Sequence, residues 1–254
     1  MTFTLAIFYG LIQGLTEFLP VSSSGHLVLF NKIFGTECNF VFFSVLLHFA
    51  TLLAVVIVLW KDIKFLLKNP FSKPAKMLYV ATIPTVIIVL CFKGFFEDAF
   101  SGNLLPVCFL ITAILLAITQ IFAKTIVPQK INFKAAVIVG LVQGLAVLPG
   151  ISRSGATISA GVLLGVDKKT ASRFSFLLSI PIILASIAHE ILSVITTGAS
   201  LFDVGIAPSL VAFMVAFVSG LFCVRFMLTV FQKINLWWFF AYLVIITGVS
   251  FFII

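Results

Sequence analysis

Six stretches of about twenty predominantly apolar residues dominate the sequence, and each is long enough to cross the hydrocarbon core of a bilayer as a helix. They cover residues 41–60, 77–96, 104–123, 174–195, 206–230 and 236–254. Only 9% of the residues are charged, whereas a soluble domain carries roughly 25%. A chain with so few charges cannot cover a water-facing surface, which excludes a soluble enzyme, a nucleic-acid-binding protein and a disordered chain. We therefore predict an all-α integral membrane protein with six full transmembrane helices.

Four other apolar stretches are too short or too interrupted to span a bilayer, at residues 3–15, 22–34, 134–147 and 155–165. They form two adjacent pairs, and each pair is joined by a segment rich in Pro, Gly and Ser, at residues 18–25 and 148–155. Half-length helices joined in this way are typical of re-entrant hairpins. Irregular backbone at membrane depth is tolerated only where it is buried in protein or lines a wet cavity. The sequence therefore predicts two re-entrant helix hairpins.

The two halves of the chain resemble each other. The segment Gly10-Leu11-Ile12-Gln13-Gly14-Leu15 matches Gly140-Leu141-Val142-Gln143-Gly144-Leu145, and Ser24-Gly25 matches Ser154-Gly155 at the same offset of 130 residues. Each half contains one hairpin followed by three full spans, so the second half must enter the membrane inverted. We predict a single membrane domain over residues 1–254, built as an inverted-topology repeat of about 1–123 and about 131–254. Such repeats commonly place the functional site where they meet near the midplane.

The basic residues indicate the orientation independently. The loops that this layout places on one side hold 12 of the 16 Lys and Arg residues: Lys61, Lys64, Lys68, Lys73, Lys76, Lys124, Lys130, Lys134, Lys168, Lys169, Arg173 and Lys233. The other side receives only Lys32 and Lys93, together with the acidic residues Glu37, Glu97, Asp98 and Asp203. Because basic loops mark the cytoplasmic face, we expect both termini and the mouth of the first hairpin to lie outside.

Three ionisable residues, Glu17, His26 and Arg153, lie in the interrupted hairpins, where a charge is costly and usually faces a cavity or a partner. The same segments carry six hydroxyl residues: Ser22, Ser23, Ser24, Ser152, Ser154 and Thr157. In a purely structural interpretation, Glu17 and Arg153 form a buried ion pair and the serines cap half-helices. The number of polar groups favours a functional site instead.

The pattern is typical of an anion-binding site. Each break is followed by a new half-helix, whose first N–H groups and positive dipole end attract phosphate. Arg153 adds a planar fork suited to phosphate oxygens, and Ser22 to Ser24 provide a hydroxyl nucleophile whose proton His26 or Glu17 could accept. Glu17, with Gln13 one turn earlier on the same helix face, could also hold a divalent cation through oxygen ligands. This set fits phosphoryl transfer.

Residues 13–26, Gln-Gly-Leu-Thr-Glu-Phe-Leu-Pro-Val-Ser-Ser-Ser-Gly-His, resemble the first signature of the undecaprenyl-diphosphatase (bacitracin-resistance) family. Residues 149–157, Pro-Gly-Ile-Ser-Arg-Ser-Gly-Ala-Thr, resemble the second. The resemblance covers the whole chain. It implies an integral-membrane phosphatase that converts undecaprenyl diphosphate to undecaprenyl phosphate, the lipid carrier of cell-wall precursors. It also implies a multi-pass protein of the bacterial plasma (inner) membrane, with the outer side periplasmic.

The resemblance also implies roles for single residues. Ser23 is similar to the proposed nucleophile, with Ser22 as the nearby alternative, and His26 to its proton-transfer partner. Glu17 is similar to the residue that activates the site or binds a divalent cation, magnesium or calcium, and Arg153 to the phosphate clamp. The first motif opens on Glu or Gln in the family, so Gln13 leaves Glu17 as its only carboxylate, which argues against a two-carboxylate metal clamp. We expect the remaining polar residues to bind substrate: Gln13, Ser22, Ser24, Ser152, Ser154 and Thr157.

Other interpretations remain open at this stage. Inverted repeats and broken helices also build secondary transporters and lipid flippases, in which Arg153 would bind an anionic lipid without reaction, and one protein could combine hydrolysis with return of its lipid product. His48, in the first full span, either lines the cavity or is a hydrogen-bonded helix residue. We interpret His189 and Glu190 as an interfacial pair. The expected partners are a polyprenyl diphosphate and the lipid bilayer, without nucleic acid, and none of these patterns bears on oligomeric state.

Overall fold

The computed structural model describes residues 1–35, 40–123, 129–197, 205–230 and 233–254, and its regular elements there are all helices. Six of them occupy the predicted long stretches: α3 (Phe40–Val58), α5 (Lys73–Cys91), α7 (Leu105–Phe122), α10 (Lys168–Thr197), α11 (Ile206–Val230) and α12 (Trp237–Ile253). By length and composition, α5, α7, α10 and α11 are able to cross a membrane, and α3 is so together with its continuation α4 (Trp60–Lys68). Helix α12 is equally apolar but shorter. The prediction of an all-α, multi-pass membrane protein is confirmed.

Two helices were not predicted, because they are short and carry charges. Helix α4 follows α3 after a bend of 78°, and α6 (Lys93–Ala99) follows α5. Two long helices also begin earlier than their apolar stretches. Helix α5 starts at Lys73 with a proline in its first turn, where proline is tolerated.

Helix α10 starts at Lys168, and the preceding Asp167 accepts a hydrogen bond from the Thr170 N–H at 2.9 Å. Partial burial alone would raise the pKa of the Asp167 carboxyl, but the hydrogen bonds from Thr170 outweigh it and hold this pKa below its ordinary value. The charged carboxylate caps the helix.

The four short apolar stretches form half-length helices in two pairs, α1 (Phe3–Thr16) with α2 (Ser23–Phe34), and α8 (Phe133–Leu145) with α9 (Arg153–Leu163). Both second helices begin at a capping serine. Ser22 Oγ accepts from the Gly25 N–H at 3.3 Å, and Ser152 Oγ accepts from the Gly155 N–H at 3.0 Å. The predicted helix–break–helix units are therefore present, with each break at its Pro, Gly and Ser residues.

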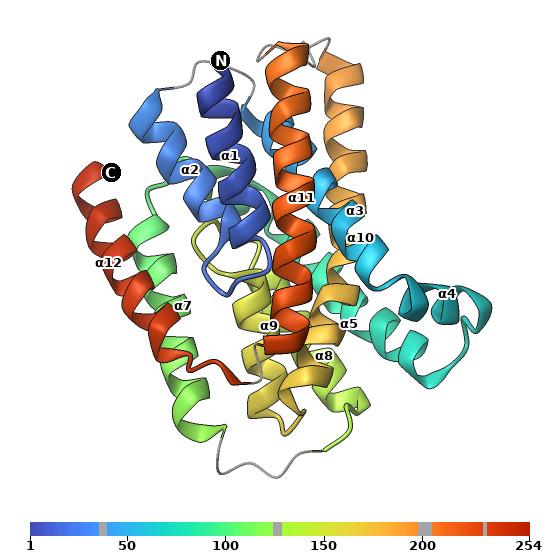
Figure 1. The fold of residues 1–254 in the computed structure, drawn as a ribbon. Helices are drawn as coiled ribbons and strands as arrows, with labels where there is room; N and C mark the ends of the chain where they lie inside the picture. Colours follow the sequence, from blue (N-terminus) through green and yellow to red (C-terminus); the bar gives the residue numbers. More distant parts are fainter. Residues whose placement is uncertain (36–39, 124–128, 198–204, 231–232) are drawn as a thin grey trace.

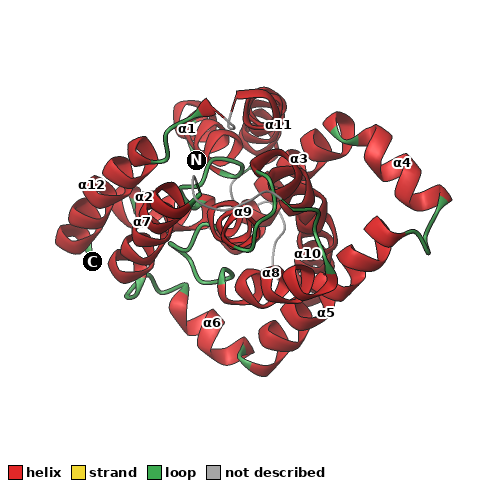
Figure 2. Ribbon diagram, turned by 90° about the horizontal axis from the view of Figure 1, so that it is seen from below, coloured by secondary structure: helices red, strands yellow, loops and turns green. Residues whose placement is uncertain are grey.

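Glycines allow the first half-helix of each pair to pack closely against a long helix of the other half of the chain. Helix α1 lies along α11 (Figure 1), and a Cβ added to Gly10 would come within 2.5 Å of the Ala212 carbonyl oxygen. Helix α8 lies along α5 in the same way, and a Cβ on Gly140 would come within 2.1 Å of the Ala81 carbonyl oxygen. These contacts bring the two breaks together inside the bundle, and Figure 2 shows the largely buried α9 near its centre.

Candidate active site

The two breaks contact each other directly. Ser22 Oγ accepts a second hydrogen bond, from the Gly150 N–H at 3.1 Å, and Ser154 Oγ donates to the Leu19 carbonyl oxygen at 3.0 Å. Ser22 holds a φ of 70°, in the left-handed region that a residue with a side chain rarely adopts. Such strain persists where the surroundings enforce it, often at functional sites. The first turns of α2 and α9 consequently begin side by side, with N–H groups that helix geometry leaves without intrahelical partners.

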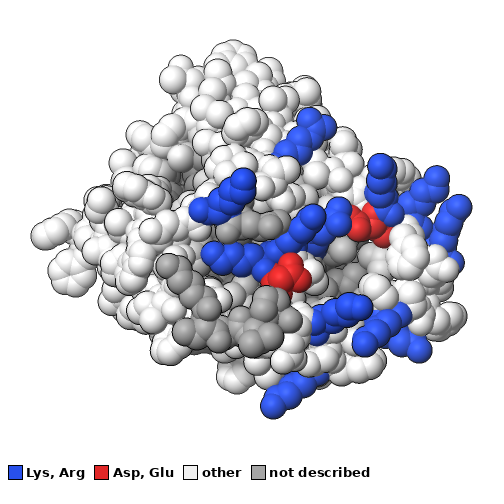
Figure 3. Space-filling view, turned by 60° about the horizontal axis from the view of Figure 1, so that its bottom comes forward, with Lys and Arg blue, Asp and Glu red and all other residues white. Residues whose placement is uncertain are grey.

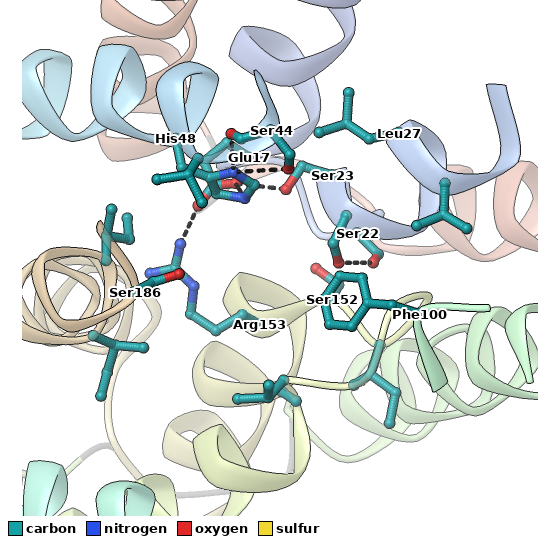
Figure 4. Close-up of a pocket in the computed structure, with 18 of the residues that line it drawn as sticks. Glu17, Ser22, Ser23, Leu27, Ser44, His48, Phe100, Ser152, Arg153 and Ser186 are labelled. Carbon is teal, nitrogen blue, oxygen red and sulfur yellow. Dashed lines mark hydrogen bonds and ion pairs between the residues drawn. The ribbon is translucent and has the colours of Figure 1, made fainter. Parts of the chain in front are cut away.

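Glu17, between α1 and the first break, is the centre of the site. Its side chain is only 2% exposed, and Ser23 Oγ donates to its Oε2 at 2.5 Å. Arg153, the first residue of α9, donates to Oε1, and Gln13 Nε2 donates to Oε2 at 3.0 Å. Figure 4 shows Arg153 reaching across from the second half of the chain toward Glu17. A serine hydrogen-bonded to a carboxylate is the arrangement of a nucleophile and its base.

His48, on α3, forms a third wall of the site. Its Nδ1 lies 2.7 Å from the Ser44 carbonyl oxygen, which can only accept, so Nδ1 carries the hydrogen and Nε2 faces Glu17 Oε2 at 3.5 Å. The His48 side chain is 22% exposed and lines the cavity, as Figure 4 shows. Of the two interpretations of this histidine, the structure supports the cavity-lining one. The sequence signal was a titratable side chain in an otherwise uncharged apolar span.

His26 lies in a different environment from the one we expected. The side chain is fully buried and does not line the cavity. Its Nδ1 lies 2.7 Å from the Ser22 carbonyl oxygen and its Nε2 lies 2.6 Å from the Tyr242 hydroxyl, on whose ring it stacks. Both ring nitrogens are therefore engaged away from Ser23, and the proton acceptor that the structure brings to Ser23 is Glu17.

The remaining predicted substrate-binding residues fall into two groups. Ser22, Ser23, Ser24 and Ser152 line the cavity together with Glu17 and Arg153. Gln13, Ser154 and Thr157 lie behind it: Thr157 Oγ1 donates to the Arg153 carbonyl oxygen at 2.7 Å, and Gln13 Nε2 lies 3.4 Å from Thr51 Oγ1. These three side chains support the residues in front of them. The ion pair and the serine caps of the structural interpretation are thus both present, in the same place as a serine–carboxylate pair.

The cavity in front of these residues has a volume of about 550 Å³, within the usual range for small-molecule sites. Its polar wall is the serine, Glu17 and Arg153 cluster. The opposite walls are apolar: Leu27, Val28, Val45, Ile182, Ile183 and Ile187. His189 also lines it, so this histidine is part of the cavity wall rather than only an interfacial residue; the side chain of Glu190 lies outside the described residues. A cavity with one phosphate-binding wall and apolar remaining walls suits an amphiphilic substrate.

A divalent cation has few protein ligands available here. The described residues contain no group of three His, Cys, Asp or Glu side chains that could hold a metal ion. Both Glu17 oxygens already accept hydrogen bonds, and it is the amide nitrogen of Gln13 that faces Glu17, while Gln13 Oε1 is buried without a partner. Magnesium is commonly bound through one or two carboxylates plus substrate phosphates. The site therefore fits a cation shared with phosphate oxygens and lacks a protein-only metal cage.

The comparisons with known proteins agree with this geometry. The family model described as "Bacitracin resistance protein BacA" matches residues 6–249. The chain belongs to this family. Similar BacA-related proteins, named Undecaprenyl-diphosphatase, include that of Carboxydothermus hydrogenoformans, 43% identical over 249 residues that cover 96% of this chain and 94% of the relative. That of Christiangramia forsetii is 42% identical, covering 93% and 92%, and that of Halothermothrix orenii is 38% identical, covering 89% and 88%. The resemblance noted in the two motifs is confirmed.

Proposed function

We propose that this chain is an undecaprenyl-diphosphatase, an integral-membrane hydrolase that converts undecaprenyl diphosphate to undecaprenyl phosphate and inorganic phosphate. Relatives of that name match almost the whole chain. The observation that carries the proposal is the hydrogen bond from Ser23 to a buried Glu17 that Arg153 also contacts, at the wall of a largely apolar cavity.

The reaction proceeds in two steps. Ser23 Oγ attacks the terminal phosphorus while its proton passes to Glu17 Oε2, and the bond from that phosphorus to the bridging oxygen breaks, releasing undecaprenyl phosphate. Water then attacks the phosphoserine, the bond from phosphorus to Ser23 Oγ breaks, and Glu17 returns the proton to that oxygen. Inorganic phosphate leaves, and the serine and carboxylate are restored.

Charge on the transferred group is neutralised by this chain's own residues. Arg153 moves its fork from Glu17 to the phosphate oxygens, as bidentate recognition of phosphate requires. The first N–H groups of α2 and α9 contribute the positive ends of two helix dipoles. Glu17, together with the substrate's phosphate oxygens, holds a divalent cation, magnesium or calcium, which adds further neutralisation when bound.

We also propose that the fold is an inverted-topology repeat with six full spans and two re-entrant hairpins in a single domain over residues 1–254. The helix contacts support two repeats, about 1–123 and about 131–254. Gly10 packs on Ala212 and Val215, and Gly140 packs on Ala81 and Pro84; each partner pair is related by 131 residues, since 81 + 131 = 212 and 84 + 131 = 215.

The capping serines and the first residues of α2 and α9 repeat at 130 residues. Ser22 corresponds to Ser152, and Ser23 corresponds to Arg153. Equivalent positions of the two repeats thus supply the nucleophile and the phosphate clamp.

The orientation that we propose places the chain in the bacterial plasma (inner) membrane, with both termini and the first hairpin's mouth on the periplasmic side. The basic side chains of the described residues gather on one face, seen in Figure 3; Lys124, Glu37 and Asp203 lie outside the described residues. The cavity is lined by Glu97 of α6 and by His189, both in segments expected on the periplasmic side. This favours substrate in the outer leaflet.

The test is phosphate release from undecaprenyl diphosphate by the purified protein in detergent with magnesium. We expect Ser23→Ala to lower the rate roughly a thousandfold, the scale on which proton transfer and nucleophile activation act. The matched variant Ser22→Ala should mainly lose a helix cap, about 1 kcal/mol of stability. A wild-type protein that moves the lipid between leaflets of vesicles without releasing phosphate would be a transporter, and that result would overturn the proposal.

A further inference from the structure

Helix α4 lies in a position that the reaction does not explain. It bends by 78° from α3, and because α3 belongs to the transmembrane bundle, the bend directs α4 close to the plane of the membrane surface. Figure 2 shows α4 projecting at the edge of the molecule, beyond α3 and α10. An ion pair between Asp62 and Arg173 of α10, at 3.5 Å, holds it there, and Ile63 packs against the core.

The sequence of α4 is strongly amphipathic. Lys61, Lys64 and Lys68 are spaced three and four residues apart and share one face of the helix. Trp60 and Leu67 are 52% and 72% exposed on a neighbouring face. A helix with lysines beside exposed Trp, Phe and Leu side chains is typical of elements that lie in the membrane interface.

The lysines continue past the end of α4 into the start of α5, with Lys73 and Lys76. None of the five lysines from Lys61 to Lys76 forms an ion pair with the described residues, and Asp62, the acid within α4, is already paired with Arg173. Figure 3 shows Lys and Arg side chains clustered on this face of the molecule. Clusters of four to eight basic residues next to a transmembrane helix bind anionic lipid headgroups.

We propose that α4 and the first turn of α5 form a binding surface for anionic phospholipids of the phosphatidylglycerol class. The exposed aromatic and aliphatic side chains, Trp60, Phe65, Leu67 and Phe71, enter the hydrocarbon edge. The lysines contact the headgroup phosphates above them. With the orientation proposed above, these lipids belong to the cytoplasmic leaflet, and the surface is separate from the phosphatase site.

Trp60 provides a natural reporter. In a Trp237→Phe/Trp238→Phe variant it is the only tryptophan, and its fluorescence is measured in phosphatidylcholine bilayers that contain either brominated phosphatidylglycerol or brominated phosphatidylcholine. We expect brominated phosphatidylglycerol to associate roughly threefold more strongly around Trp60, a conservative value for several lysines near the surface. Adding Lys61→Gln, Lys64→Gln and Lys68→Gln should abolish this preference.

The matched control uses Trp238 as the reporter, in a Trp60→Phe/Trp237→Phe variant. Trp238 is 76% exposed at the start of α12, on the same expected side but away from the five lysines, and should show no preference. Unchanged phosphate release in detergent verifies that the lysine variant is folded. Equal quenching of Trp60 by both brominated lipids would overturn the proposal. So would quenching by neither lipid, which is the result expected if α4 instead docks on a protein.

Discussion

The buried pair of Glu17 and Arg153 allows stability and activity to be separated. Arg153→Met removes the cation and leaves a carboxylate that is 2% exposed without its charged partner. Breaking a buried pair from one side typically costs 3–5 kcal/mol. Ser23 and Gln13 still donate to Glu17, so we expect the lower end, about 3 kcal/mol, which corresponds to a fall in Tm of roughly 6–12 °C for a chain of this size.

The double variant Glu17→Gln/Arg153→Met removes both charges. Replacing a buried pair by neutral groups is often nearly neutral in stability, so its Tm in detergent should return to within a few degrees of wild type. Phosphate release should be lost in both the single and the double variant, because the base and the phosphate clamp are gone. An Arg153→Met variant that unfolds at the wild-type temperature, or a double variant as unstable as the single, would refute the reasoning.

Three further predictions concern packing, His26 and the cation. Gly140→Ala should destabilise the protein by about 1–3 kcal/mol, because its Cβ meets backbone of α5, whereas Gly248→Ala, with no neighbour in reach, should not lower the Tm. Tyr242→Phe leaves His26 Nε2 without its partner and should cost about 1–3 kcal/mol; it should slow phosphate release far less than Ser23→Ala, and an equal loss would assign His26 a direct role. Calorimetry should detect no tight magnesium binding until a diphosphate lipid is present, and Glu17→Gln should abolish that binding; tight binding without lipid would show a protein-only site.

The helix–break–helix units could be predicted because their signal is local. Pro20 and the serines of the break end one apolar run and cap the next, and the second break repeats this pattern around Ser152. Helices α4 and α6 escaped prediction because their charges mask any apolar run. Amphipathic helices at a membrane surface do not show the continuous hydropathy that identifies a span.

The members of the site could be predicted more easily than their contacts. Glu17, Ser23 and His26 are close in sequence, and sequence alone left Glu17 and His26 as equal candidates for the serine proton. The turn of α2 decides between them, because it directs His26 toward Tyr242, 216 residues away. The position of His48 depends on which side of an apolar helix faces α1, and tertiary packing determines that choice.

The most direct test of the central claim is a search for the phosphoryl group on the enzyme. The purified protein is mixed with undecaprenyl diphosphate and magnesium, quenched in acid within one turnover, digested and examined by mass spectrometry. We predict a phosphoryl group on Ser23, formed at least as fast as phosphate is released and absent from Ser23→Ala. Phosphate release at the wild-type rate by Ser23→Ala, or a phosphoryl group on Ser22 instead, would contradict the assignment of Ser23 as the nucleophile.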